Sequence, residues 1–105
     1  GAYYAGPYKR FREEMAEVVP LILGESFEPY EGPLKVDIEF YVTRPKKTKL
    51  GAPKADIDNF LKATLDVMNQ RLWVDDTQIV EIYATKQWTR PKEDGYFTIG
   101  VDQLP

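Results

Sequence analysis

The sequence predicts a small α+β fold in which a mixed β-sheet packs with two helices. Two segments carry apolar residues at three- and four-residue spacing, which is typical of amphipathic helices, and three others alternate apolar and polar residues, which is typical of half-buried strands. The expected order is helix, strand, helix, strand, strand. The chain has 105 residues, a length typical of one domain, so we expect residues 1–105 to form a single domain.

The first helix is expected from Tyr8 to Leu23. Pro20 makes its last turn less regular, and Gly24 is a suitable residue for its end. Charged residues separate the apolar positions, as an amphipathic helix requires. The apolar positions are Phe11, Met15, Val18, Val19 and Ile22.

The first strand is expected over residues 33–43, where alternate side chains are apolar and predict one buried face. This face consists of Leu34, Val36, Ile38, Phe40 and Val42. A second helix is expected from about Asn59 to Leu72, and its apolar stripe consists of Leu61, Leu65, Met68 and Leu72. Residues 78–88 and 96–101 alternate again, with Val80, Ile82 and Ala84 on one side of the first segment. The turn-like residues 90–95 between them predict an antiparallel hairpin.

The composition limits the chemistry that is available. The chain has no Cys and no His, which excludes disulfides, thiolate nucleophiles and the commonest zinc ligands. Catalysis would have to use carboxylates, Lys, Arg, Tyr, Ser or Thr. No apolar run is long enough for a membrane span, and there is no signal peptide at the start, so we expect a cytoplasmic protein. The start at Gly1 without a Met indicates either an expression scar or a trimmed N-terminus.

The charges are unevenly distributed, although the net charge is only −3. Residues 44–54 contain five basic side chains and no acidic one, and Pro45, Gly51 and Pro53 predict that this segment is a loop. Residues 56–76 then contain five aspartates against only Lys62 and Arg71. We call residues 44–54 the basic loop. Its basic side chains are Arg44, Lys46, Lys47, Lys49 and Lys54.

Two pairs of aspartates flank the second helix. Asp56 and Asp58 are two residues apart in what we expect to be an extended approach, so their carboxylates point to the same side. Asp75 and Asp76 follow the helix. The helix separates the pairs by about 20 Å, so they form one site only if the chain brings its two ends together. Such a site has oxygen ligands alone, which suits Mg²⁺ or Mn²⁺.

Each of these features also has an ordinary structural interpretation. Asp56 or Asp58 is a favoured N-cap residue for the helix, and Asp75-Asp76 is typical of a turn. Lys62 lies four residues after Asp58 and four before an acidic residue, a spacing that favours surface salt bridges. The basic loop alone is compatible with a solvated connection. The combination around one short helix is what favours function.

That combination fits phosphodiester hydrolysis. This reaction needs a divalent cation to activate water and to neutralise the charge that grows on the phosphate oxygens. It also needs cationic side chains that bring the DNA backbone past the carboxylates, which would otherwise repel it. The basic loop supplies these charges. Lys62, one turn into the helix, can stabilise the transition state or orient the nucleophile.

The motif Asp56-Ile-Asp-Asn-Phe-Leu-Lys62, followed by Trp73-Val-Asp-Asp-Thr-Gln78 and Lys86, resembles the RusA family of Holliday junction resolvases. The resemblance spans about residues 34–88. It implies a small homodimeric, Mg²⁺-dependent endodeoxyribonuclease that nicks opposing strands of four-way DNA junctions. It further implies that Asp56, Asp58 and Asp76 are catalytic metal ligands, with Asp75 beside them. The lysine at position 62 is implied to be required for cleavage.

Lys86 matches the family pattern, and we assign it to the DNA-binding set together with the basic loop. Two alternatives to junction resolution remain open at this point. One is a non-catalytic DNA-binding module whose aspartates are caps and turns, and the other is a nuclease for flaps or other branched DNA. The resemblance places the protein in the cytoplasm of a bacterial or phage-infected cell.

Overall fold

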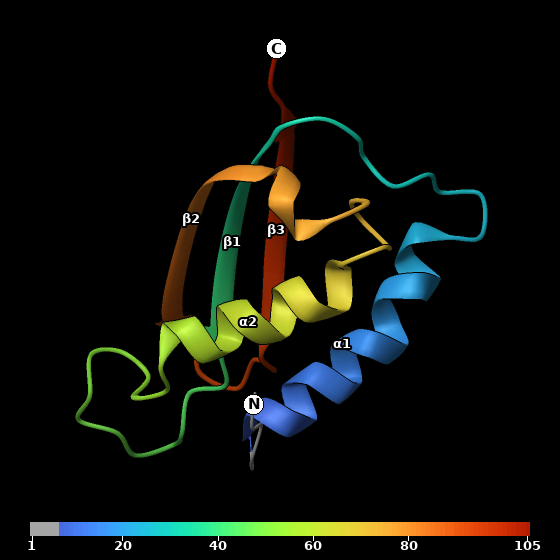
Figure 1. Ribbon diagram of the computed structural model, residues 1–105. Helices are drawn as coiled ribbons and strands as arrows, with labels where there is room; N and C mark the ends of the chain where they lie inside the picture. The colour runs from blue at the N-terminus through green and yellow to red at the C-terminus, as the bar shows by residue number, and fades with distance from the viewer. Residues whose placement is uncertain (1–6) are drawn as a thin grey trace.

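The computed structural model describes residues 7–105. Residues 1–6, where the sequence indicates an expression scar or a trimmed start, lie outside the described residues. The structure confirms the α+β prediction of two helices and a three-stranded mixed sheet (Figure 1). The elements are α1 (Pro7–Leu23), β1 (Leu34–Val42), α2 (Ile57–Met68), the short 3₁₀ helix η1 (Asp76–Gln78), β2 (Ile79–Trp88) and β3 (Tyr96–Gln103).

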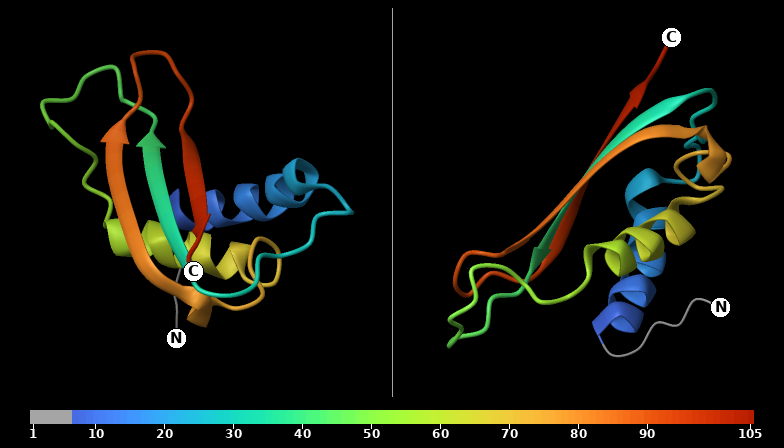
Figure 2. Two further views of the ribbon diagram at one scale, coloured as in Figure 1. Left: turned by 90° about the horizontal axis from the view of Figure 1, so that it is seen from above. Right: turned by 60° about the vertical axis from the view of Figure 1, so that its left-hand side comes forward.

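The strand order is β2-β1-β3, with β1 parallel to β2 and antiparallel to β3. The predicted hairpin of the last two strands is therefore wrong, because each of them pairs with β1. β1 takes the central position because its alternate side chains, from Leu34 to Phe40, are at most 1 % exposed. A parallel pair needs a crossover connection, and α2 supplies it between β1 and β2. Both helices lie on one face of the sheet, and the other face carries no helix (Figure 2).

The core lies between the helices and the sheet, but the helical stripes differ from those expected. α2 ends at Met68, and its buried side chains are Phe60, Ala63, Thr64, Val67 and Met68. In α1, Met15 and Val19 are buried, whereas Val18 and Ile22 are 44 % and 72 % exposed. The buried stripe of α2 is therefore displaced from the expected one, in which Leu61 and Leu65 are only half-buried. Part of the apolar stripe of α1 faces outward.

The start of β2 also differs from expectation. The register is irregular between Leu34 and Lys35, whose partners are Ile79 and Glu81. Val80 therefore has no partner on β1, and it is 62 % exposed. Ile82, expected on the buried side with Val80, is 36 % exposed. The irregular register leaves Val80 outside the core, whereas Ile82, the partner of Val36, lies on an edge strand and is only partly covered.

Candidate active site

The N-terminus of α2 carries the first pair of carboxylates. Asp56 is the N-cap residue and Asp58 lies in the first helical turn, so the extended approach that we expected for both residues ends at Asp56. Both side chains are exposed. The Asn59 N–H donates a hydrogen bond to Asp58 Oδ1 at 3.0 Å, whereas the Asp56 side chain makes no N-cap hydrogen bond. Asp56 therefore occupies the N-cap position without a side-chain capping hydrogen bond.

Aromatic packing fixes this end of α2 over the sheet. The Phe60 ring stacks on the Phe40 ring of β1, with centroids 5.3 Å apart and an angle of 23° between the planes. The Phe11 ring of α1 meets Phe60 edge-on at 5.3 Å. Phe40 and Phe60 are at most 5 % exposed. The position of the two aspartates is thus tied to the core through the first helical turn.

Two lysines flank the same helix end. Lys62 is exposed, one turn after Asp58. Lys86 is half-buried near the end of β2, and its Nζ donates a hydrogen bond to the carbonyl oxygen of Ala55 at 2.7 Å. Ala55 immediately precedes Asp56, so β2 returns a cation to the start of α2. The DNA-binding role that the sequence predicts for Lys86 stays a prediction.

The second pair of carboxylates follows α2, and Asp75 is engaged in local structure. It is the N-cap of η1, where its carboxylate accepts hydrogen bonds from the backbone N–H and the hydroxyl of Thr77. Its own N–H donates to Gln78 Oε1 at 2.8 Å, which completes a capping box. The hydrogen bonds from Thr77 lower the pKa of Asp75 from its ordinary value. The turn interpretation accounts for this residue.

Asp76 is held by a buried tryptophan. The indole N–H of Trp73, which is 0 % exposed, donates to Asp76 Oδ1 at 2.6 Å. Gln78 Nε2 donates to the carbonyl oxygens of Tyr30 and Gly32, each at 2.9 Å. The Trp-x-Asp-Asp-x-Gln motif therefore folds as one hydrogen-bonded turn. In this turn, the hydrogen bond from the buried Trp73 orients the Asp76 carboxylate.

We expect Trp73→Phe to lower the free energy of unfolding by about 1.5–3 kcal/mol, because a hydrogen bond to a charged group is lost. Chemical denaturation measures the loss. Trp88→Phe is the matched control, since its indole N–H donates to the neutral carbonyl of Leu50 at 3.0 Å in an exposed position, and about 0.5–1.5 kcal/mol is expected there. Equal losses in the two variants would contradict the role given to the Asp76 bond.

The two carboxylate pairs lie at opposite ends of α2. This helix has 12 residues, which at 1.5 Å per residue separates its ends by about 18 Å, and Figure 1 shows η1 at the opposite end of the sheet from the start of α2. Among residues 7–105, no group of three or more acidic side chains is placed to hold a metal ion. Asp56 and Asp58 both lie at the start of α2, but the structure does not bring Asp76 to them within one chain.

The basic loop connects β1 to α2 and projects beside the start of α2 (Figure 1). The loop backbone is held at its beginning, where the Arg44 N–H donates to Thr89 Oγ1 at 3.1 Å, and in its middle, where Leu50 accepts the Trp88 indole N–H. Pro53 is buried. The five cationic side chains of the basic loop are all exposed: Arg44, Lys46, Lys47, Lys49 and Lys54. The loop therefore presents its charges to solvent next to Asp56.

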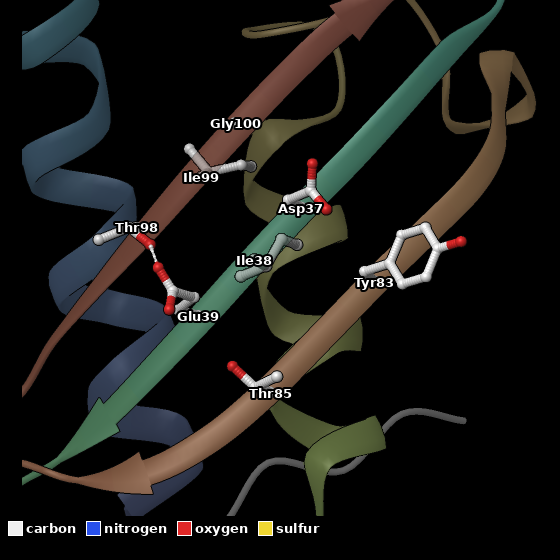
Figure 3. Close-up of a pocket in the computed structure, with 8 residues that line it drawn as sticks. All are labelled: Asp37, Ile38, Glu39, Tyr83, Thr85, Thr98, Ile99 and Gly100. Carbon is white, nitrogen blue, oxygen red and sulfur yellow. Dashed lines mark hydrogen bonds between the residues drawn. The ribbon is translucent and has the colours of Figure 1, made fainter.

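The helix-free face of the sheet has the opposite charge. A shallow hollow on this face is lined by Asp37, Ile38, Glu39, Tyr83, Thr85, Thr98, Ile99 and Gly100 (Figure 3). Glu39 accepts a hydrogen bond from the Thr98 hydroxyl at 2.9 Å. The strand register places Glu81 and Asp102 on either side of Lys35 on β1. This surface repels a polyanion, so the basic loop and the start of α2 are better suited to DNA.

The roles of Phe60, Trp73 and Gln78 in the site are not predicted from the sequence. The signal for the last two was present in the motif itself, because Trp73 precedes Asp76 by three residues and Gln78 follows by two. The signal for Phe60 was its place one turn after Asp56. None of these roles could be assigned before the packing partners of the three residues were known.

Comparisons with known proteins are consistent with this geometry. The family model described as endodeoxyribonuclease RusA matches residues 1–93, whereas the comparison with curated proteins gave no match. Within residues 7–105, neither helix combines the length and the apolar character of a membrane span. Because the match covers most of the sequence and includes both aspartate pairs, this chain belongs to the RusA family of Holliday junction-resolving endodeoxyribonucleases.

Proposed function

We propose that this protein is a Mg²⁺-dependent endonuclease that resolves four-way DNA junctions by paired phosphodiester hydrolysis in the cytoplasm. The observation that carries the proposal is the start of α2, where Asp56 and Asp58 are exposed beside the basic loop. Carboxylates alone would repel a phosphate, and cations alone would only bind it. Their adjacency provides for both binding and hydrolysis.

The ligand set suits Mg²⁺, with Mn²⁺ as a substitute. Mg²⁺ is usually held by one or two carboxylates together with water and substrate phosphates, and Asp56 and Asp58 are two exposed carboxylates on one helix end. When bound, the metal ion supplies an activated water and neutralises charge on the phosphate.

We further propose that a second copy of the chain completes the site. Asp76 has a carboxylate aimed by Trp73, but it lies at the far end of α2 from Asp56 and Asp58. In a two-fold dimer with the two α2 helices antiparallel and adjacent, the start of one helix lies beside the end of the other. Each site then takes Asp56 and Asp58 from one copy and Asp76 from the other. A junction has matching two-fold symmetry, so a symmetric dimer presents one site to each of two opposing strands.

The remaining side chains act on the DNA. We propose that the basic loop holds the phosphate backbone, with Arg44 and Lys54 at its two ends. Lys62 is exposed one turn after Asp58, and we propose that it donates hydrogen bonds to the phosphate oxygens as their charge grows. Such a preorganised cation stabilises the transition state more than the ground state.

A cleavage panel tests the proposal. We expect purified protein with Mg²⁺ to cut a synthetic four-way junction in preference to a flap or a linear duplex. Asp76→Asn should reduce cutting by about 100-fold or more, since loss of a second-shell partner alone costs 10- to 100-fold, while junction binding persists. Preferential cutting of the flap would instead favour a general branched-DNA nuclease. Salt-sensitive binding with no Mg²⁺-dependent product would favour a non-catalytic binding module.

A further inference from the structure

The contact between Lys86 and Ala55 joins two segments that are 31 residues apart in sequence. Lys86 Nζ donates to the Ala55 carbonyl oxygen at 2.7 Å from a half-buried position. The lysines of the basic loop, by contrast, are exposed. A lysine whose ammonium is directed to the protein backbone is poorly placed to act as a simple phosphate contact.

Helix stability does not explain a cation at this place. The N-terminus of a helix carries a partial positive charge, so a nearby ammonium group is unfavourable there by typically about 0.3–1 kcal/mol. The favourable charges at this end are the carboxylates of Asp56 and Asp58. Lys86 nevertheless donates a hydrogen bond to the backbone carbonyl oxygen of Ala55, directly before this helix. Its placement is therefore not explained by the helix dipole.

The same lysine lies beside the aromatic anchor of α2. In the parallel register, Lys86 is the Cα partner of Phe40, and Phe40 stacks on Phe60 in the first turn of α2. The ring stack fixes the helix over the sheet, and the ammonium group fixes the backbone one residue before the N-cap. The Lys86 hydrogen bond thus acts on the backbone directly before Asp56.

We infer that Lys86 is a positioning residue for the aspartate pair: its hydrogen bond to Ala55 sets where the Asp56 and Asp58 carboxylates stand. The inference rests on the proposed function, because it concerns the metal affinity of that site. It is an alternative to the DNA-binding role that the sequence predicts for Lys86. Phosphate contacts and positioning have different signatures, since only the former release counterions from DNA.

Lys86→Met and Lys54→Met form a matched pair for the test. Junction affinity is measured without metal over a range of salt concentrations, and Mn²⁺ binding to the DNA-free protein is measured by electron paramagnetic resonance. We expect Lys86→Met to keep the wild-type salt slope and to weaken Mn²⁺ binding about 10- to 100-fold, the range for residues that orient metal ligands. Lys86→Arg, which retains a charged donor, should restore most of the binding. Lys54→Met should lower the slope by about 0.9 and leave Mn²⁺ binding unchanged.

Two results would overturn the inference. A salt slope that falls in Lys86→Met as it does in Lys54→Met would identify Lys86 as a phosphate contact. A lower melting temperature with unchanged Mn²⁺ binding would reduce its role to fold stability. If Lys86→Met does not fold, Lys86→Gln, which is neutral and shorter, must show the same weakened Mn²⁺ binding. Asp58→Asn tests the proposed metal site separately from the role of Lys86. If this variant binds Mn²⁺ as the wild type does, the proposed metal site itself is wrong.

Discussion

Mixing two inactive variants should restore cleavage. Asp58→Asn and Asp76→Asn are each expected to lose at least about 100-fold in junction cutting, because each lacks a proposed metal ligand. In a shared-site dimer, a mixed pair has one doubly damaged site and one intact site. Random exchange makes half of the dimers mixed, so about a quarter of the wild-type number of sites returns. Gel assays with a labelled four-way junction should detect nicks in one strand instead of paired cuts.

Asp56→Asn mixed with Asp58→Asn is the control for this experiment. Both changes lie at the start of α2, so a mixed dimer of these variants has a damaged ligand in each site and should stay inactive. Differently tagged copies establish that subunits exchange. If exchange is complete and the Asp58→Asn and Asp76→Asn mixture stays inactive, each site does not draw on two copies.

Neutralising the basic loop should give the largest loss of DNA binding. The triple change of Lys46, Lys47 and Lys49 to Gln removes three exposed charges. If each contacts one phosphate, the slope of log affinity against log salt falls by about 2.7, since each contact contributes about 0.9. At 0.1 M salt this corresponds to an affinity about 10²- to 10³-fold weaker. Fluorescence anisotropy with a labelled junction at several salt concentrations measures both quantities.

Lys35→Gln with Arg71→Gln controls for the change in net charge. Lys35 lies on the helix-free face, opposite Glu81 and Asp102, and Arg71 follows α2, where it donates to the Val67 carbonyl oxygen at 2.7 Å. We expect the slope to stay near that of the wild type in this variant. If the salt slope fell by as much per removed charge as in the triple variant, DNA binding would depend on the overall charge of the protein and not on the loop.

The fold illustrates what local pattern can and cannot predict. The alternation from Leu34 to Phe40 correctly predicts β1 and its buried face, because side-chain direction along a strand follows from sequence alone. The pairing of the last two strands is predicted wrongly, since a turn between strands favours a hairpin but does not require one. Strand order depends on which strand is most buried, and that is a property of the whole sheet.

For the proposed site as well, some features follow from the sequence and others only from the tertiary structure. The sequence by itself determined which chemistry is available: carboxylates in two pairs, a run of loop cations, and no thiol or imidazole. These are properties of residue type and spacing. Only the tertiary structure decided that α2 holds Asp76 away from Asp56, that Trp73 aims the Asp76 carboxylate, and that Lys86 reaches Ala55. Such proximities arise when a rigid helix and a sheet pack together, and long-range packing leaves no local trace in the chain.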